Sequence, residues 1–211
     1  MKAIDEARLE TDLEYRFHYL CEFLNFGAED SSLIQQAAPY LGPAIPLIVE
    51  KTYEKLLAFD ATARHFIPRQ SGFDGPTPPD LSSLNANHPQ IRFRREHLAR
   101  YFQQILGRSF DARMILYLDM VGKIHTPRAG NAEIDVPLVQ MNALMGLLSD
   151  ILIDFIGQIG LDLATAFKTV RAFEKLLWIQ NDFITRHYSA SLAATLAASD
   201  AKGGPASEPP G

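Results

Sequence analysis

Residues 117–130, YLDMVGKIHTPRAG, contain a histidine that a helical pattern places among apolar side chains. Met114, Leu118, Val121 and His125 repeat at spacings of four, three and four, so they share one face of a predicted helix over 110–126. A neutral imidazole can be buried on such a face when one ring nitrogen donates to a carbonyl oxygen. The spacing alone therefore fits a core histidine as well as a ligand.

The surroundings of His125 favour the ligand. Gly122 lies three residues earlier and lowers the helix propensity by about 1 kcal/mol relative to alanine, so we expect a flat or bulky group to approach the backbone there. Two preceding predicted helices carry polar-tipped side chains that can converge on the same interior, Tyr53 on one and His97 and Tyr101 on the other.

The residue types limit the metal sites that this histidine could serve. Zinc takes three or four protein ligands, and no Cys, Glu or His accompanies His125 at metal-binding spacing. A haem already supplies four nitrogens and needs one axial ligand from the protein. The one cysteine, Cys21, excludes an internal disulfide and a multi-cysteine metal site, and it favours a cytoplasmic location.

The composition excludes other classes of function. A net charge of -5 argues against nucleic-acid binding, and the cluster of Arg92, Arg94 and Arg95 before Glu96 is interpreted as a solvated helix face. No glycine-rich phosphate loop occurs, which argues against a nucleotide enzyme.

A membrane span is not expected either. The longest apolar candidate, residues 141–159, is interrupted by Asp150 and Asp154, so it predicts a buried helix. The N-terminal residues carry charges where a signal peptide would need an unbroken apolar run.

Helical periodicity extends over nearly the whole chain, and no alternating strand pattern of useful length occurs. Helices are expected over residues 6–26, 29–40, 46–58, 88–106, 110–126, 137–159 and 162–197. Proline, glycine and asparagine between residues 68 and 89 predict a long surface loop. The composition of residues 198–211 predicts a disordered tail.

Three stretches, in this order and spacing, resemble the protoglobin and globin-coupled-sensor branch of the globin superfamily. They are TYEKLLAFDATARHFIP at 52–68, HLARYFQQILGRSFDARM at 97–114 and VGKIHTPRAG at 121–130. The resemblance implies an all-α, globin-like helical sandwich over residues 28–190, preceded by an extra N-terminal helix within residues 1–27. The residues after His125 are closer to free-standing members than to sensors, so a stand-alone form is expected.

The resemblance also implies a haem b cofactor (iron protoporphyrin IX) and assigns roles around it. His125 matches the proximal iron ligand, whose other ring nitrogen should donate to a backbone carbonyl. Tyr53 matches the distal tyrosine, whose hydroxyl can donate to bound dioxygen. Phe66 matches the aromatic residue that packs flat against the porphyrin, although plain core packing would explain it too.

Other residues of the same helices are expected near the cofactor. Met114, Leu118 and Val121 share the helical face of His125 and are expected to contact the haem. Tyr101 lies where protoglobins commonly have an apolar aromatic residue, so a second distal hydroxyl is a departure from the family pattern. His97, one turn earlier, is a weaker candidate for contact with the gas or with a propionate.

Several charged residues flank the proline-rich loop. Arg64, Arg69 and Arg92 are possible partners for the haem propionates. His65 and His88 are expected to be exposed.

The last two predicted helices are apolar over more than one face, which exceeds what one haem pocket would cover. In relatives these helices pair across a two-fold axis as a four-helix bundle, so the resemblance implies a homodimer. A thick monomeric core is the alternative. The apolar positions are Leu144, Leu147, Leu148, Ile151, Phe155, Ile159, Phe167, Val170, Phe173, Leu177 and Trp178.

The resemblance implies a haem protein that reversibly binds a diatomic gas (O2, CO or NO) as a sensor or carrier. A haem enzyme that consumes nitric oxide or peroxide with an external electron donor is the alternative. A helical interaction module without cofactor, in which His125 is a core residue, is a third hypothesis.

Overall fold

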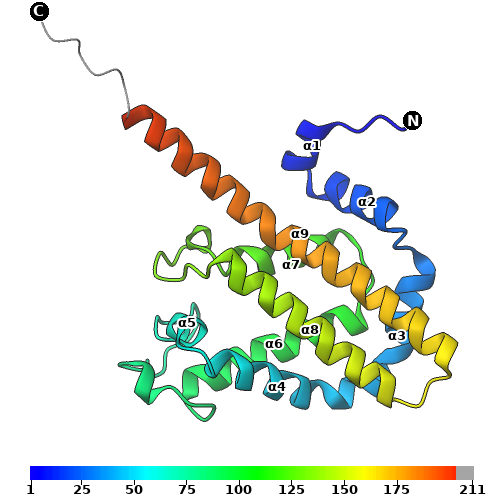
Figure 1. The fold of residues 1–211 in the computed structure, drawn as a ribbon, viewed down its shortest axis with the longest axis horizontal. Helices are drawn as coiled ribbons and strands as arrows, with labels where there is room; N and C mark the ends of the chain where they lie inside the picture. The colour runs from blue at the N-terminus through cyan, green and yellow to red at the C-terminus, as the bar shows by residue number, and fades with distance from the viewer. Residues whose placement is uncertain (203–211) are drawn as a thin grey trace, which may run out of the picture.

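The structure is built around one long C-terminal helix, α9 (Leu163–Lys202). The computed structural model describes the backbone of residues 1–202 and the side chains of residues 1–188, and no β-strand occurs in this part of the chain. α9 contacts α2, α3, α7 and α8 and crosses most of the molecule in Figure 1. The predicted all-α fold is confirmed.

The other helices follow one another with short connections, apart from the loop before α6. They are α1 (Glu6–Thr11), α2 (Leu13–Leu24), α3 (Ala28–Leu41), α4 (Ile45–Leu57), α5 (Asp60–Ala63), α6 (Pro89–Gly107), α7 (Ala112–Lys123) and α8 (Leu138–Gln158). Single 3-10 turns occur at η1 (Gly42–Ala44), η2 (Arg64–Phe66), η3 (Leu81–Ser83) and η4 (Pro127–Ala129). The predicted helices between residues 29 and 159 agree with α3, α4, α6, α7 and α8 to within three residues at each end.

Asp12 divides the N-terminal helix, which the sequence predicted as continuous over 6–26. Its backbone is extended (φ -118°, ψ 104°), and its side chain accepts a hydrogen bond from the Tyr15 N–H group. A carboxylate at this place caps a new helix because it satisfies an N–H group that has no partner in the first turn. The apolar periodicity continues across the break and therefore could not reveal it.

The C-terminal end of α9 differs from the prediction. The helix was expected to end near residue 197, with a disordered tail over 198–211, whereas α9 continues to Lys202. Its last turns extend past the other helices in Figure 1. Residues 203–211 lie outside the described part of the chain.

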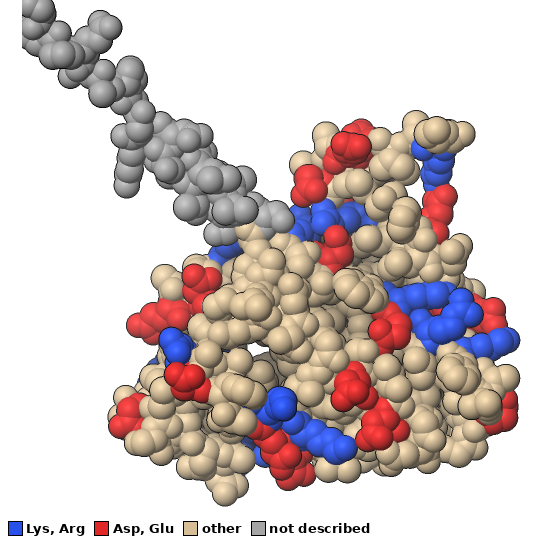
Figure 2. Space-filling view, in the orientation of Figure 1, with Lys and Arg blue, Asp and Glu red and all other residues tan. Residues whose placement is uncertain are grey.

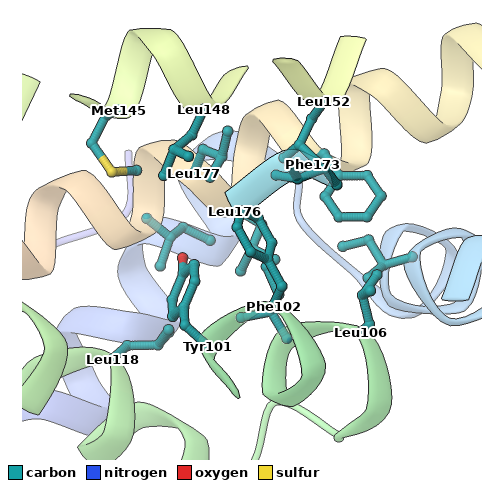
Figure 3. Packing of buried hydrophobic residues seen from close by; sticks show 14 of the residues in the cluster. Tyr101, Phe102, Leu106, Leu118, Met145, Leu148, Leu152, Phe173, Leu176 and Leu177 are labelled. Carbon is teal, nitrogen blue, oxygen red and sulfur yellow. The ribbon is translucent and has the colours of Figure 1, made fainter. Parts of the chain in front are cut away.

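The apolar core joins α6, α8 and α9. Phe102, Phe173 and Leu176 are each at most 1 % exposed, and Figure 3 shows them packed together between these helices. Burial of such large side chains is the main favourable term that holds the three helices together. Tyr101, next to Phe102, directs its hydroxyl toward the side of the core formed by Met145 of α8 (Figure 3).

Gly122 allows α7 to approach the backbone of α9. A Cβ atom at this position would lie 2.4 Å from the carbonyl oxygen of Phe183 and 2.9 Å from the Cα atom of Ile184. No side chain fits in this contact without a shift of one helix. The expected close approach of a flat or bulky group to this backbone is confirmed, and that group is the backbone of α9.

Two partly buried ion pairs fix the N-terminal helices to α9. The guanidinium of Arg16 on α2 donates to both carboxylate oxygens of Asp182, with one N–O distance of 2.9 Å. Lys175 lies 2.8 Å from a carboxylate oxygen of Asp30 on α3. Charge-assisted bonds of this kind are the strong ones, and they attach α2 and α3 to the same core.

α8 is the one helix within residues 1–202 that is long and apolar enough, by composition alone, to cross a membrane. In the fold it packs against α9 and α4. Its side chains Met141, Leu148 and Leu152 are at most 3 % exposed. The apolar residues on the inner face of α8 therefore form part of the core.

Candidate functional site

A cavity of about 440 Å³ lies between α4, α6, α7 and α8, with α9 at its base. The segments around η2 and the connection before α8 complete its wall. Its size is in the range of small-molecule and cofactor pockets, which are mainly apolar with a few convergent polar groups. Tyr53, Phe66, His97, Tyr101 and His125 all line it, so the structure brings together side chains from four separate segments.

His125 lies two residues beyond Lys123, the last residue of α7, and its ring faces the cavity. The Nδ1 atom is 2.8 Å from the carbonyl oxygen of Val121. A carbonyl oxygen can only accept, so Nδ1 carries the proton and Nε2 keeps its lone pair. Burial lowers the pKa of His125 to about 4, so the ring is neutral near pH 7. A neutral imidazole oriented by a carbonyl is the form that binds metal ions.

The backbone around His125 is held from two sides. The N–H group of Val136 donates to the carbonyl oxygen of His125 over 3.0 Å. The hydroxyl of Tyr188 on α9 donates in turn to the carbonyl oxygen of Val136. The hydroxyl of Thr126 donates to the carbonyl oxygen of Lys123 over 2.9 Å. These bonds order the turn that positions the ring before any ligand binds.

Tyr53 and Phe66 form a second wall of the cavity. Tyr53 is 6 % exposed, and its ring centroid lies 5.6 Å from that of Phe66. Within residues 1–188, whose side chains are described, neither the hydroxyl of Tyr53 nor that of Tyr101 forms a hydrogen bond. Burial raises the pKa of both tyrosines, so both stay protonated and available as donors.

His97 lines the cavity and is also exposed to solvent, which places it at the edge of the cavity. Its Nδ1 atom is 2.9 Å from the carbonyl oxygen of Phe93, and the two rings meet edge to face with centroids 4.4 Å apart. A carbonyl oxygen can only accept, so the proton of this hydrogen bond is on Nδ1.

Met114 and Leu118 do not line the cavity. They are 2 % and 0 % exposed and belong to the apolar core, so their contact with a cofactor stays a prediction that the cavity wall does not support. α7 ends at Lys123, before His125, so the regular helical face that carries Met114 and Leu118 does not extend to the histidine. The cavity is lined from α7 by Tyr117, Met120 and Val121.

The three arginines named as possible propionate partners lie away from the cavity. Arg64 is 3.3 Å from a carboxylate oxygen of Asp60, and Arg69 donates to carbonyl oxygens of its own loop. Arg92 is exposed on α6. None of them lines the cavity, because each is directed to solvent or to its local backbone.

His65 and His88, which flank the loop, were expected to be exposed. In the structure both are half-buried. His65 is half-buried, lines the cavity, and has a pKa lowered by burial and by the neighbouring Arg64. His88 is half-buried and caps α6, where its Nδ1 accepts a hydrogen bond from the Gln90 N–H group over 3.2 Å.

Arg94 lines the cavity, whereas the charge pattern of residues 92–96 predicted a solvated helix face. Its guanidinium lies 5.1 Å from the ring centroid of Phe66, and one nitrogen donates to the carbonyl oxygen of Pro68 over 3.3 Å. Burial lowers its pKa to about 10, so it remains charged near pH 7. Its spacing of three and seven residues from His97 and Tyr101 put it on their helical face, which could have revealed it.

The polar atoms of the cavity fit a bound cofactor. Buried polar groups in proteins are nearly always hydrogen-bonded. Within the described residues, buried atoms without a partner include Arg94 Nε, the Tyr101 hydroxyl, Gln140 Oε1 and Gln180 Oε1, all on residues that line the cavity. No group of three His, Cys, Asp or Glu that could hold a metal ion occurs in that part of the chain. A metal in a macrocycle, which needs one protein ligand, suits this arrangement.

Comparison with known families supports the same cofactor. The family model described as Protoglobin matches residues 13–193, which is most of the chain and includes Tyr53 and His125. No curated protein matches the chain. The family implies a globin-type haem protein that binds a gas. By this match, and with the cavity and its neutral histidine in place, the chain belongs to the protoglobin family.

Proposed function

We propose that this protein reversibly binds a diatomic gas at the iron of haem b, with His125 as the protein ligand, and that it serves as a gas sensor or carrier. The hydrogen bond from His125 Nδ1 to Val121 carries the proposal, because it leaves the lone pair of Nε2 available in the cavity. Oxygen, carbon monoxide and nitric oxide are the candidate gases.

Different residues of the cavity would hold the haem, donate to the gas and exclude water. His125 would hold the haem, which would supply an iron able to take a diatomic gas. The carbonyl of Val121 orients the His125 ring and increases its basicity. The protonated hydroxyl of Tyr53 can donate to a ligand that carries partial negative charge. Phe66 and the apolar walls exclude water and so strengthen this bond.

Absorption spectroscopy tests the proposal. Purified protein should show a Soret band that shifts when the reduced sample takes up carbon monoxide. Tyr53→Phe should release oxygen at least about tenfold faster than wild type, since a charge-assisted hydrogen bond contributes roughly 1.5–3 kcal/mol. A folded, colourless protein from haem-supplemented cells would support the cofactor-free alternative instead.

A haem enzyme that consumes nitric oxide or peroxide is a second candidate. It is favoured by His97, whose Nε2 has no hydrogen-bond partner among residues 1–188 and lies at the cavity edge, where a proton could be exchanged with solvent. An external electron donor would be required. If oxygenated protein consumes nitric oxide no faster than free haem in a stopped-flow experiment, this candidate is excluded.

We also propose that the protein forms a homodimer through α8 and α9. Figure 2 shows a mainly uncharged surface over these helices, with the charged residues gathered toward its edges. Val139 and Ile153 on α8 are 72 % and 45 % exposed, and Phe167 and Trp178 on α9 are both 63 % exposed. Each pair has the spacing of one helical face. Large exposed apolar surfaces of this kind favour protein contacts, and two-fold dimers are the commonest oligomers.

A further inference from the structure

Within residues 1–188, Arg94 has no acidic partner, in contrast to two other partly buried arginines of the fold, Arg16 and Arg186. Arg16 pairs with Asp182, and Arg186 lies 2.6 Å from a carboxylate oxygen of Asp119. Among the described side chains, no carboxylate forms an ion pair with Arg94. Its Nε atom is buried without a hydrogen-bond partner.

The contacts that Arg94 does make leave most of its binding capacity unused. One terminal nitrogen donates to the carbonyl oxygen of Pro68, and the ring of Phe66 lies under the guanidinium at 5.1 Å. An aromatic face and one carbonyl oxygen compensate only part of the cost of removing a cation from water. Proteins usually pair such a charge with an anion.

The charged group of Arg94 acts on the interior of the cavity. It lowers the pKa values of His65 and His125 and opposes the rise in the pKa of Tyr53. These three residues come from different segments of the wall, so the guanidinium lies within electrostatic range of each. Among the side chains of residues 1–188, no carboxylate lines the cavity. The missing anion must therefore enter with the ligand.

We infer that Arg94 binds a propionate carboxylate of the porphyrin and thereby fixes the orientation of the macrocycle in the cavity. This inference rests on the proposed function. A guanidinium offers several N–H groups in one plane, which match the two oxygens of a carboxylate. Arg94 is thus a positioning residue of the cofactor, unlike Arg64, Arg69 and Arg92, which do not line the cavity.

Iron-free protoporphyrin IX and its dimethyl ester separate this interaction from iron ligation by His125. Both probes have the same ring, but esterification removes both negative charges. Binding to the haem-free full chain is measured by porphyrin fluorescence. Wild type should bind the diacid at least about tenfold more tightly than the ester, in line with the loss of a charge-assisted bond.

Variants assign this preference to one residue. Arg94→Met should bring the ratio of the two affinities close to one. Arg94→Lys, which keeps the charge without the planar fork, should retain part of the preference. Arg92→Met, on the exposed side of the same helix, should keep the wild-type ratio. Circular dichroism verifies that each variant is folded.

The outcomes distinguish this inference from the proposed function. Equal binding of diacid and ester by wild type would overturn it. An unchanged preference in Arg94→Met would overturn it as well. If wild type bound neither porphyrin, both proposals would fail. A clear preference together with no iron ligation by His125 would overturn the proposed function alone.

Discussion

The side chain of His125 hydrogen-bonds to the carbonyl oxygen that its own backbone would bind in a regular α-helix. Its backbone N–H group donates to Gly122 over 3.4 Å, and its Nδ1 lies 2.8 Å from the carbonyl oxygen of Val121. The last carbonyls of a helix lack intrahelical partners. One bond therefore completes the end of α7 and selects the ring nitrogen that remains for a metal.

The burial of His125 should make the haem-free protein sensitive to acid. Its pKa is about 4 in the folded protein and about 6.5 in the unfolded chain, so the unfolded chain binds more protons between these pH values. Stability contributed by the neutral ring is present above pH 6.5 and is lost as the pH falls toward 4. The expected loss is about 2–3 kcal/mol at pH 4.5.

Urea unfolding at pH 7 and pH 4.5 measures this loss. His125→Gln has no titrating ring, so its stability should fall less than that of wild type over the same interval. His65 and His187, whose pKa values are also lowered, are present in both proteins, and their contributions cancel. Identical pH dependence of the two proteins would contradict the burial of His125.

Gly122→Ala should destabilise the fold. The added methyl group would meet the backbone of Phe183 at 2.4 Å, and backbone atoms cannot rotate away as a side chain can. A loss of about 2 kcal/mol or more is expected in chemical denaturation. Gly107→Ala is the matched control, because a Cβ atom there has no neighbour within 4 Å. The contact would be disproved if both variants behaved alike.

Removal of the Tyr101 hydroxyl should not weaken the haem-free protein. This hydroxyl is buried without a partner, so Tyr101→Phe removes an unsatisfied group and should leave stability unchanged or raise it by about 1 kcal/mol. Tyr188→Phe, which breaks the bond to Val136, should lower stability by about 1 kcal/mol. Thermal unfolding measures the stabilities of the two variants. A clear loss of stability in Tyr101→Phe would show that the Tyr101 hydroxyl has a hydrogen-bond partner.

Trp178→Glu should dissociate the proposed dimer. A charge in an apolar interface is costly to bury, so the variant should sediment as a monomer at concentrations where wild type sediments at twice that mass. Leu116→Glu introduces the same charge at an exposed site on α7 and should leave the mass unchanged. A wild-type protein that sediments as a monomer would contradict the dimer.

The sequence pattern was sufficient for the helices and for much of the cavity. Periodicity locates the inward face of each helix, and Tyr53, Tyr101 and His125 line the cavity, as does Phe66, which only the family resemblance indicated. It does not identify the neighbour that each inward face meets. Gly122 therefore predicted the close approach of a flat or bulky group, but not that this group is the backbone of α9.

Arg94 shows a second limit of sequence patterns. Three arginines within four residues followed by a glutamate are typical of a solvated helix face, and charge is normally taken to mark exposure. A charged side chain can be enclosed in a cavity, because a charge on the ligand can compensate it. The spacing of Arg94 from His97 and Tyr101 indicates a shared helical face. The position of α6 relative to Phe66 and Pro68 shows that this face is enclosed.

The most direct measurement of the central claim is the absorption spectrum of His125→Gly, recorded with and without imidazole. If His125 is the iron ligand, the variant should lose the wild-type Soret spectrum or its haem, and free imidazole in the vacated space should restore both. Retention of the wild-type spectrum and of haem by His125→Gly without imidazole would contradict the account.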